Sequence, residues 1–168
     1  MYRFLILICL KTLLFASITE PISVCLIRVS FAEDSISSTT GNGQFLLTNK
    51  GIDCGTYTID QPPHDYNYFL SQLKSVNTYY QNVSYGKFGI DIENSHIYPS
   101  SINGNYQLIE TMNYYNPYND YSLQEKRLTN LFKDALEKSY EIDQIEFSNY
   151  DLVIVFHAGI GQDFSLPF

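Results

Sequence analysis

The sequence has no tryptophan, and cysteine and histidine are scarce, with three of each among 168 residues. So few cysteines exclude the dense disulfide framework on which many small secreted domains depend. Basic residues are also few: 10 Lys and Arg stand against 18 Asp and Glu, which gives a formal charge of -8 at pH 7. We therefore expect no nucleic-acid partner, because an acidic surface repels a polyanion.

Cys9 lies in the apolar start of the chain, which leaves Cys25 and Cys54 as the only pair that a mature protein could join. One disulfide between them is possible by count. Two free, buried thiols are an alternative that the sequence leaves open.

The amino-terminal segment MYRFLILICLKTLLFASI is apolar, with Arg3 near its start and small residues near its end. This arrangement predicts a signal peptide over residues 1–20, and hence a secreted protein with no membrane partner once the leader is removed. The second apolar run, residues 22–32, could instead belong to the leader, with cleavage after Ala32. We favour a buried strand there, since VCLIRVSF is short, β-branched and bounded by Pro21 and an acidic pair.

Helix and strand patterns alternate along residues 21–168, which we treat as one domain. An unbroken apolar run at residues 152–156 predicts a second buried strand, central in its sheet and covered on both sides. Two such strands with helices between them favour an α/β fold, with α+β as the alternative. The expected sheet is mixed, partly parallel, twisted and flanked by helices.

Two segments have the i, i+3, i+4, i+7 apolar spacing of amphipathic helices. The first follows Asp65, an expected N-cap, and its apolar positions are Tyr66, Phe69, Leu70, Leu73, Val76 and Tyr80. The second covers residues 123–140, with Ser122 and Glu125 in the spacing of a capping box. Its expected buried face consists of Leu128, Leu131, Phe132, Ala135, Leu136 and Tyr140.

Shorter elements are predicted from turn signals and from period-2 alternation. Residues 85–93 alternate apolar and polar positions and favour a half-buried strand. Residues 41–48 favour a turn that enters a short strand, and residues 54–60 favour a further strand. Residues 96–108 are interpreted as a loose loop, and residues 110–117 as a short helix or turn that ends at an Asn-Pro pair.

The sequence contains none of the compact motifs that carry hydrolytic or metal chemistry. None of the histidines His64, His96 and His157 is followed by Glu, so the H-E-x-x-H helix of a zinc protease is absent. G-x-S-x-G and D-x-D-x-D are absent as well, and Cys54 has no patterned histidine partner. We therefore assign no catalytic, cofactor-binding or metal-binding residue in the chain.

His157 follows an apolar strand, in the stretch DLVIVFHAGIGQDF. Ligands bind outside the carboxyl ends of strands in open α/β sheets, so we expect a cleft at this position. The candidate cleft-lining residues are His157, Gly159, Gly161, Gln162 and Asp163. A structural alternative is a ring that hydrogen-bonds a neighbouring loop carbonyl or Asp163, and we favour this role over direct catalysis.

Several segments, taken in order, resemble a known family. They are VCLIRVSF, TTGNGQF, a Pro-Pro-His segment, TYYQNVSYGKFGIDI, YQLIETMNYYNPY, LTNLFKDAL and NYDLVIVFHAGIGQDF. Together they resemble the start of the catalytic domain of immune inhibitor A-like secreted zinc metallopeptidases, over residues 22–168. YYQNVSYGKF and DLVIVFHAGIGQDF are the most specific of these segments.

The resemblance implies a zincin-like amino-terminal subdomain of an extracellular endopeptidase that acts on a protein or peptide substrate. In that family one zinc is held by a His-Glu-x-x-His helix and a third ligand, and the motif Glu is the general base. The zinc helix lies downstream of the segment that DLVIVFHAGIGQDF matches, so no zinc ligand transfers to this chain. We expect an incomplete, amino-terminal part of such a domain, inactive alone and without a tight zinc site.

A second function class fits the composition. The chain has 15 Tyr and 11 Phe, and tyrosine both stacks and hydrogen-bonds at low entropic cost. The alternative is therefore a secreted, non-catalytic module that binds glycan or protein through Tyr- and Asn-rich loops such as NYYNPYNDY. Tyrosines that close loops over the core would give the same composition without a ligand, and we favour that role for them.

Overall fold

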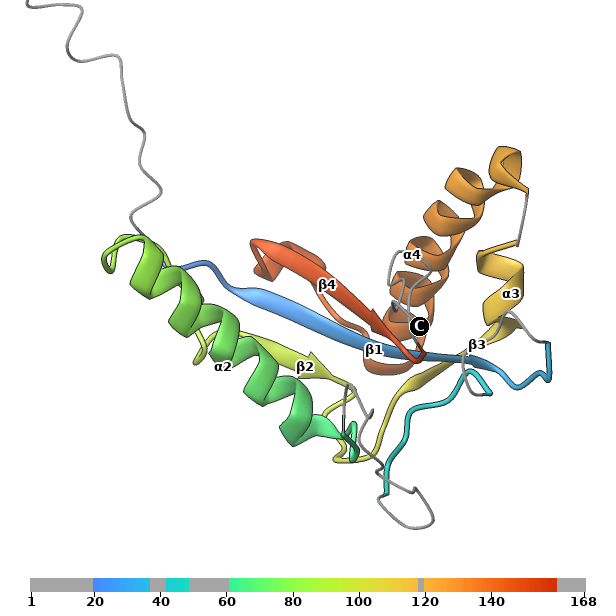
Figure 1. The fold of residues 1–168 in the computed structure, drawn as a ribbon. Coiled ribbons are helices and arrows are strands. Elements are labelled where there is room, and N and C mark those ends of the chain that lie inside the picture. Colours follow the sequence, from blue (N-terminus) through green and yellow to red (C-terminus); the bar gives the residue numbers. More distant parts are fainter. Residues whose placement is uncertain (1–19, 37–41, 49–60, 118–119, 160–168) are drawn as a thin grey trace, which may run out of the picture.

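A computed structural model describes residues 20–36, 42–48, 61–117 and 120–159 (Figure 1). The predicted signal peptide lies outside these ranges except for its last residue, Glu20. The strand expected at residues 54–60 lies outside them entirely. Within them the chain forms, in order, β1 (Val24–Ala32), α2 (Tyr66–Val83), β2 (His96–Tyr98), β3 (Tyr106–Thr111), α3 (Met112–Tyr115), α4 (Tyr121–Asp143), the 3-10 turn η1 (Phe147–Asn149) and β4 (Leu152–His157).

β1 is the central strand of a four-stranded sheet, and its three pairings are all parallel. β4 pairs with one edge of β1, from Val24 to Val29. β2 and β3 follow one another along the other edge, first opposite Cys25 and then opposite Val29. An α/β fold with a sheet that is at least partly parallel is therefore confirmed, although the described pairings of β1 include no antiparallel one, as a mixed sheet would have. Among the described strands the central one is β1, and the run at residues 152–156 pairs with β1 alone.

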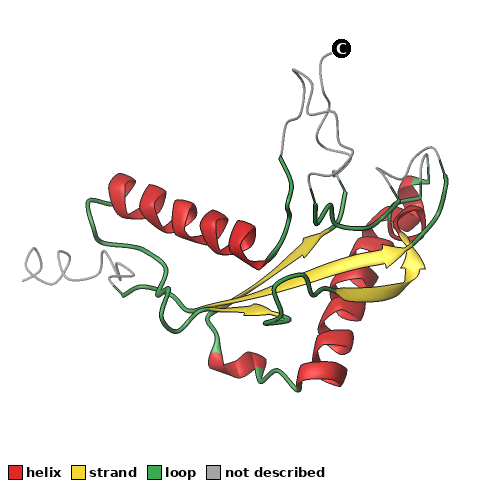
Figure 2. Cartoon of the chain, turned by 90° about the horizontal axis from the view of Figure 1, so that it is seen from below, coloured by secondary structure: helices red, strands yellow, loops and turns green. Residues whose placement is uncertain are grey.

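The two faces of β1 pack against different helices, so the sheet is a middle layer (Figure 2). On one face the odd-numbered residues of β1 pack against α3 and α4, in a core that includes Cys25, Ile27, Val29, Phe31, Tyr115, Leu131 and Ala135. On the other face Val24 packs with Leu73 of α2, and Leu26 packs with Phe69. The predicted strand VCLIRVSF is confirmed, and it is buried along its length.

Arg28 is the charged residue of β1, and it is only 1% exposed. Its guanidinium donates to the carbonyl oxygens of Ile102 at 3.2 Å and Ser101 at 2.8 Å, and also to that of Pro99. The Ile102 carbonyl in turn accepts from the N–H of Tyr66 at 2.8 Å. Arg28 thus fastens the loop between β2 and β3 to the first turn of α2.

Residues 85–93 do not form the predicted strand. Within the described ranges their ladder contact is a single parallel bridge, between Ile22 and Ile90. The N–H of Phe88 donates to Ser84 Oγ at 2.9 Å, and that of Ile90 donates to Asn77 Oδ1 at 2.8 Å. Side chains at the end of α2 therefore take the donors that a strand would need.

Residues 42–48 form a turn without the expected strand. The carbonyl of Gly43 accepts from the N–H of Phe31 at 2.9 Å, and Gln44 Nε2 donates to the Phe31 carbonyl at 2.5 Å. Conversely, the segment interpreted as a loose loop, residues 96–108, contains β2 and the first half of β3. Buried and exposed residues do alternate in β3. The sequence does not reveal this alternation, because one of the exposed positions is an isoleucine, Ile109, which is 87% exposed.

The prediction of α2 is confirmed in its start and cap, and its buried face is wrong at two of six positions, Val76 and Tyr80. Asp65 Oδ1 accepts from the N–H of Tyr68 at 3.0 Å. Phe69 is buried, whereas Val76 and Tyr80 are each 42% exposed. The carboxyl-terminal end of α2 extends past the strands (Figure 1), so the apolar stripe continues beyond the surface that it covers.

The predicted capping box of α4 is wrong. The helix begins at Tyr121, and its N-cap residue Asp120 makes no side-chain cap bond. Ser122 lies inside the first turn and donates to Asp120 Oδ1 at 2.6 Å. The short helix α3 is confirmed, and it ends at Tyr115 just before the Asn-Pro pair. Of the described helices, none is both long and apolar enough to cross a bilayer.

The expected apolar face of α4 is only partly covered. Leu131 and Ala135 are buried, but Leu128, Phe132 and Tyr140 are 62%, 44% and 59% exposed. The strand after the helix is also less covered than predicted, because the five residues after Leu152 in β4 are half-buried and Leu152 is exposed. Both departures concern the same part of the molecule, around α4 and β4.

Candidate functional site

β1 and β4 are parallel, and the sequence predicts a cleft beside their carboxyl-terminal ends. Val29 is the register partner of His157, and the N–H of Ala158 donates to the Val29 carbonyl at 2.9 Å. Gly159 follows with a φ of 87°, a left-handed conformation that glycine adopts without strain. The other candidates lie outside the described residues: Gly161, Gln162 and Asp163.

The ring of His157 lies on the α4 side of the sheet, half-buried, with its centroid 5.8 Å from that of the Phe31 ring. Its Nδ1 is 3.0 Å from the carbonyl oxygen of Ala158. A carbonyl oxygen only accepts, so this contact requires a proton on Nδ1, and in a neutral ring the lone pair is then on Nε2. A bond from the ring to a neighbouring carbonyl is therefore confirmed, and the cleft-lining role stays a prediction.

His96 lies at the opposite, amino edge of the sheet, because it begins β2. Its Nδ1 is 3.0 Å from the hydroxyl of Tyr150, which is 3.1 Å from the hydroxyl of Tyr98. Burial raises the pKa of Tyr150 above its usual range, so this hydroxyl keeps its proton. The result is a short chain of hydrogen bonds that links the start of β2 to the start of β4.

A polar cavity of about 410 Å³ opens beside this chain, lined by Pro21, Ser23, Asp91, Asn94, His96, Asn149, Tyr150 and Asp151. Hydrogen bonds from the Asn94 side chain and backbone hold the pKa of Asp91 below its usual value. The backbone N–H of Ser23 does the same for the pKa of Asp151. Both carboxylates are thus ionised and accept hydrogen bonds from neighbouring protein groups. We therefore assign them a structural role.

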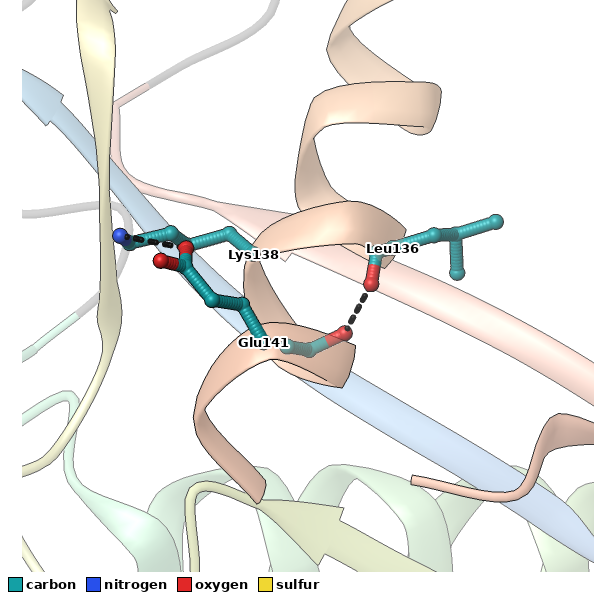
Figure 3. Close-up of polar contacts among 4 residues, drawn as sticks. Leu136, Lys138 and Glu141 are labelled. Atoms are coloured by element: carbon teal, nitrogen blue, oxygen red, sulfur yellow. Dashed lines mark hydrogen bonds and ion pairs between the residues drawn. The ribbon is translucent and has the colours of Figure 1, made fainter. Parts of the chain in front are cut away.

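A second cavity, of about 440 Å³, separates β3 and α3 from α4, and its lining includes Glu110, Asp134, Glu137 and Glu141. Lys138 also lines this cavity, and its Nζ lies 3.0 Å from Glu141 Oε2 (Figure 3). Tyr115 donates to Asp134 at 2.8 Å, and burial, followed by this carboxylate, raises the pKa of Tyr115. An acidic lining favours cations in general, but it does not identify a ligand.

The described residues do not fit a zinc site. Among them no three His, Cys, Asp or Glu side chains are grouped as metal ligands. His157 and His96 lie at opposite edges of the sheet. Cys25 is a free thiol among the described residues, and its possible partner Cys54 lies outside them. Burial raises the pKa of Cys25 to about 11, which disfavours the thiolate that binds metals.

Sequence reasoning missed the His96–Tyr150–Tyr98 chain. Tyr150 is 54 positions from His96 and 52 from Tyr98, and no spacing motif connects them. They meet because β2 and β4 both run parallel to β1, with the starts of all three strands at one edge. A correct strand order, which the sequence did not supply, would have been the necessary signal.

Comparison with known proteins adds no family to these observations. No family model matches the chain. No curated protein and no solved structure matches it either.

Proposed function

We propose that the chain is the amino-terminal part of the catalytic domain of a secreted zinc-dependent endopeptidase similar to the immune inhibitor A-like family. One observation carries the proposal: in DLVIVFHAGIGQDF, one of the two segments with the most specific resemblance, residues 152–157 form β4 beside the central strand, and β4 ends in His157. In open α/β sheets the edge at the carboxyl ends of the strands is where functional groups gather. Helices on both faces of a parallel sheet support the α/β part of the proposal, and the zincin-like subdomain is proposed from the resemblance alone.

In such an enzyme a bound zinc would activate the nucleophile and polarise the substrate carbonyl. The described residues supply no ligand set for it, so their part is to form the sheet and one wall of the cleft. His157 contributes an oriented ring there, because the Ala158 carbonyl accepts the Nδ1 proton and the neutral ring then directs its Nε2 lone pair outward from this contact. Gly159 then lets the backbone turn sharply out of the sheet.

The alternative, a non-catalytic module that binds glycan or protein through tyrosine-rich loops, has less support. In the segment NYYNPYNDY, Tyr115 is buried and bonded to Asp134. The guanidinium carbon of Arg127 lies 3.5 Å from the centroid of the Tyr114 ring and covers it. These two rings close the loop over the core, as favoured from the sequence, and offer little free surface to a ligand.

Two measurements test the proposal. The messenger RNA is expected to encode an H-E-x-x-H helix in frame downstream of codon 168, and a stop codon directly after it would contradict us. The full chain by itself is expected to show no peptidase activity and less than a tenth of a zinc per molecule after dialysis, about the trace level of adventitious binding. One tightly bound zinc per chain would overturn the proposal and direct attention to His64, His96 and His157.

A further inference from the structure

Exposed aromatic and apolar side chains gather at the carboxyl-terminal end of α2, where the helix extends past the strands (Figure 1). The ring centroid of Tyr80 lies 5.4 Å from that of Tyr79 and 5.3 Å from that of Phe88. Tyr79, Val83 and Tyr85 are 61%, 54% and 92% exposed. These five residues form the α2 patch. Single exposed apolar residues are ordinary, but a contiguous group of them needs an explanation.

The α2 patch carries almost no charge. Residues 75–90 include a single charged side chain, Lys87. We therefore do not expect a partner that binds by ion pairs to cover it. Aromatic rings among neutral polar side chains suit a sugar, whose C–H face packs on a ring while its hydroxyls stay in water.

The sequence places a sugar acceptor inside this patch. Asn82-Val83-Ser84 is the one N-x-S/T sequence of the chain, and its middle residue is not proline, as acceptance of an N-linked glycan requires. Asn82 is exposed on the last turn of α2. Tyr79 precedes it by three residues and is thus its neighbour on the helix, and the Asn82 carbonyl accepts from the N–H of Tyr85 at 3.3 Å. The acceptor therefore lies between the two most exposed rings of the patch.

The side-chain amide of Asn82 is also available. It makes no hydrogen bond to another described residue. Asn77, one and a half turns earlier on α2, differs in this respect, because its Oδ1 accepts from the N–H of Ile90 at 2.8 Å. A group attached to Asn82 would therefore displace no contact of the fold.

We infer that Asn82 carries an N-linked glycan and that the first sugars of this glycan lie over the rings of Tyr79 and Tyr85. A covalent link at the centre of the α2 patch keeps the sugars there whatever their intrinsic affinity for the rings. The exposed acceptor and the exposed rings thus have one explanation. The inference rests on the secretory leader that the proposed function includes, and it does not depend on the peptidase assignment.

The transfer needs a lipid diphosphate-linked oligosaccharide as donor and the membrane-bound oligosaccharyltransferase of a secretory route. The amide nitrogen of Asn82 bonds to the anomeric carbon of the first sugar, and the bond from that carbon to the diphosphate oxygen breaks. The lipid diphosphate leaves with the electron pair of the broken bond, and the proton that the amide loses balances its charge. Ser84 Oγ accepts from the N–H of Phe88 at 2.9 Å and donates to its carbonyl at 3.1 Å in the fold, so we expect transfer before α2 has folded.

Secretion of the full chain from cultured eukaryotic cells tests the acceptor, with mass spectrometry before and after treatment with peptide N-glycosidase. We expect one glycan per chain, located by the conversion of Asn82 to aspartate that the enzyme leaves. Asn82→Gln and Ser84→Ala should each lose the glycan. Ser84→Thr is the matched control and should keep it, because the hydroxyl and the N-x-S/T pattern both remain.

Tyrosine nitration, followed by peptide mapping, tests whether the glycan covers the patch. Tyr140 on α4 is the matched control, since it is 59% exposed and Tyr79 is 61% exposed. The glycoprotein should nitrate at Tyr79 and Tyr85 at least threefold more slowly than the Asn82→Gln protein, with an unchanged rate at Tyr140. Far-ultraviolet circular dichroism checks that both proteins fold alike. Equal rates at Tyr79 and Tyr85 would overturn the placement of the sugars.

A variant in which an established secretory leader replaces residues 1–20 separates the inference from the predicted leader. A glycan on this variant alone would support the acceptor and contradict the leader. No glycan on this variant, or a full chain that reaches the medium without one, would overturn the inference. The peptidase proposal is decided by the coding sequence and the zinc content, so the failure of either one is recognisable by itself.

Discussion

The carboxylate of Asp151 accepts two hydrogen bonds from Ser23, one from the backbone N–H and one from the hydroxyl, each at 2.8 Å. In return the N–H groups of Asp151 and Leu152 donate to the Ser23 carbonyl, both at 3.1 Å. The two residues are 128 positions apart, and they lie just before β1 and β4. Their contact therefore fixes the register between the first and last strands of the described sheet.

Asp151→Asn is expected to lower the melting temperature at pH 7 and to lose this effect in acid. The Ser23 N–H lowers the pKa of Asp151 in the folded protein, so the ionised group stabilises the fold above its unfolded pKa of about 3.9. That stability is lost as the pH falls through the folded pKa. Melting curves of both proteins should therefore differ by a constant amount from pH 7 to about pH 5 and converge below about pH 4. A difference that persists undiminished at pH 2 would contradict this account.

The elements that could be predicted are those with a long local pattern. VCLIRVSF and LVIVF are strands because apolar, β-branched runs of that length suit a sheet interior, and α2 begins where Asp65 caps it. The failure at residues 85–93 has a local cause, which is competition for backbone donors. Ser84 and Asn77 take the N–H groups of residues 88 and 90, and periodicity alone carries no information on that competition.

The candidate site shows the same limit. The position of His157 at the end of a strand follows from the local sequence, and so does a carbonyl partner for its ring. The contact between His96 and Tyr150 depends on which strands are neighbours, and that depends on pairings between distant segments. A single sequence without a strand order does not contain this information.

Phe69→Ala is expected to destabilise the protein by about 3–5 kcal/mol, the usual cost of removing a buried aromatic ring. Phe69 is 2% exposed, and its ring centroid lies 5.4 Å from that of Phe45 and 5.1 Å from that of Phe156. Val76→Ala is the matched control on the same stripe of α2, and it should cost less than about 0.5 kcal/mol at a surface position. Urea unfolding measures both. Equal costs would mean that the end of α2 is covered in solution.

Tyr85→Gly is expected to stabilise the protein. Tyr85 has a φ of 56° and is 92% exposed, so its ring gains little from packing while its Cβ strains the left-handed backbone. Relief of that strain, less the entropy that glycine loses on folding, should raise the free energy of unfolding by about 0.5–1 kcal/mol. Tyr85→Ala keeps the Cβ and should change the stability much less. A Gly variant less stable than the Ala variant would show that the left-handed conformation is not strained.

Cys25 is expected to resist alkylation in the folded protein at pH 8 and to react on unfolding. It is fully buried, and burial raises its pKa to about 11. The raised pKa stabilises the fold fully below the unfolded value of about 8.5, and this contribution is lost as the pH rises from there through 11. Peptide mapping after iodoacetamide treatment measures the first effect. Alkaline unfolding of Cys25→Ala, whose stability should fall less steeply above about pH 8.5, measures the second. Rapid labelling of the native thiol would contradict both.

Arg28→Met is expected to destabilise the protein by about 3 kcal/mol or more, because a carbonyl that loses its donor on burial costs about 1–3 kcal/mol. Arg28 is the donor for the carbonyls of Pro99, Ser101 and Ile102. Arg28→Lys should be intermediate, since an ammonium cannot reproduce the fork of the guanidinium. Faster exchange of the Tyr66 amide, which donates to the Ile102 carbonyl, would locate the damage in this loop. A Met variant as stable as the wild type would contradict this prediction. It would mean that the desolvation cost of the buried arginine equals the contribution of its hydrogen bonds, so that Arg28 defines the conformation of the loop without stabilising the protein.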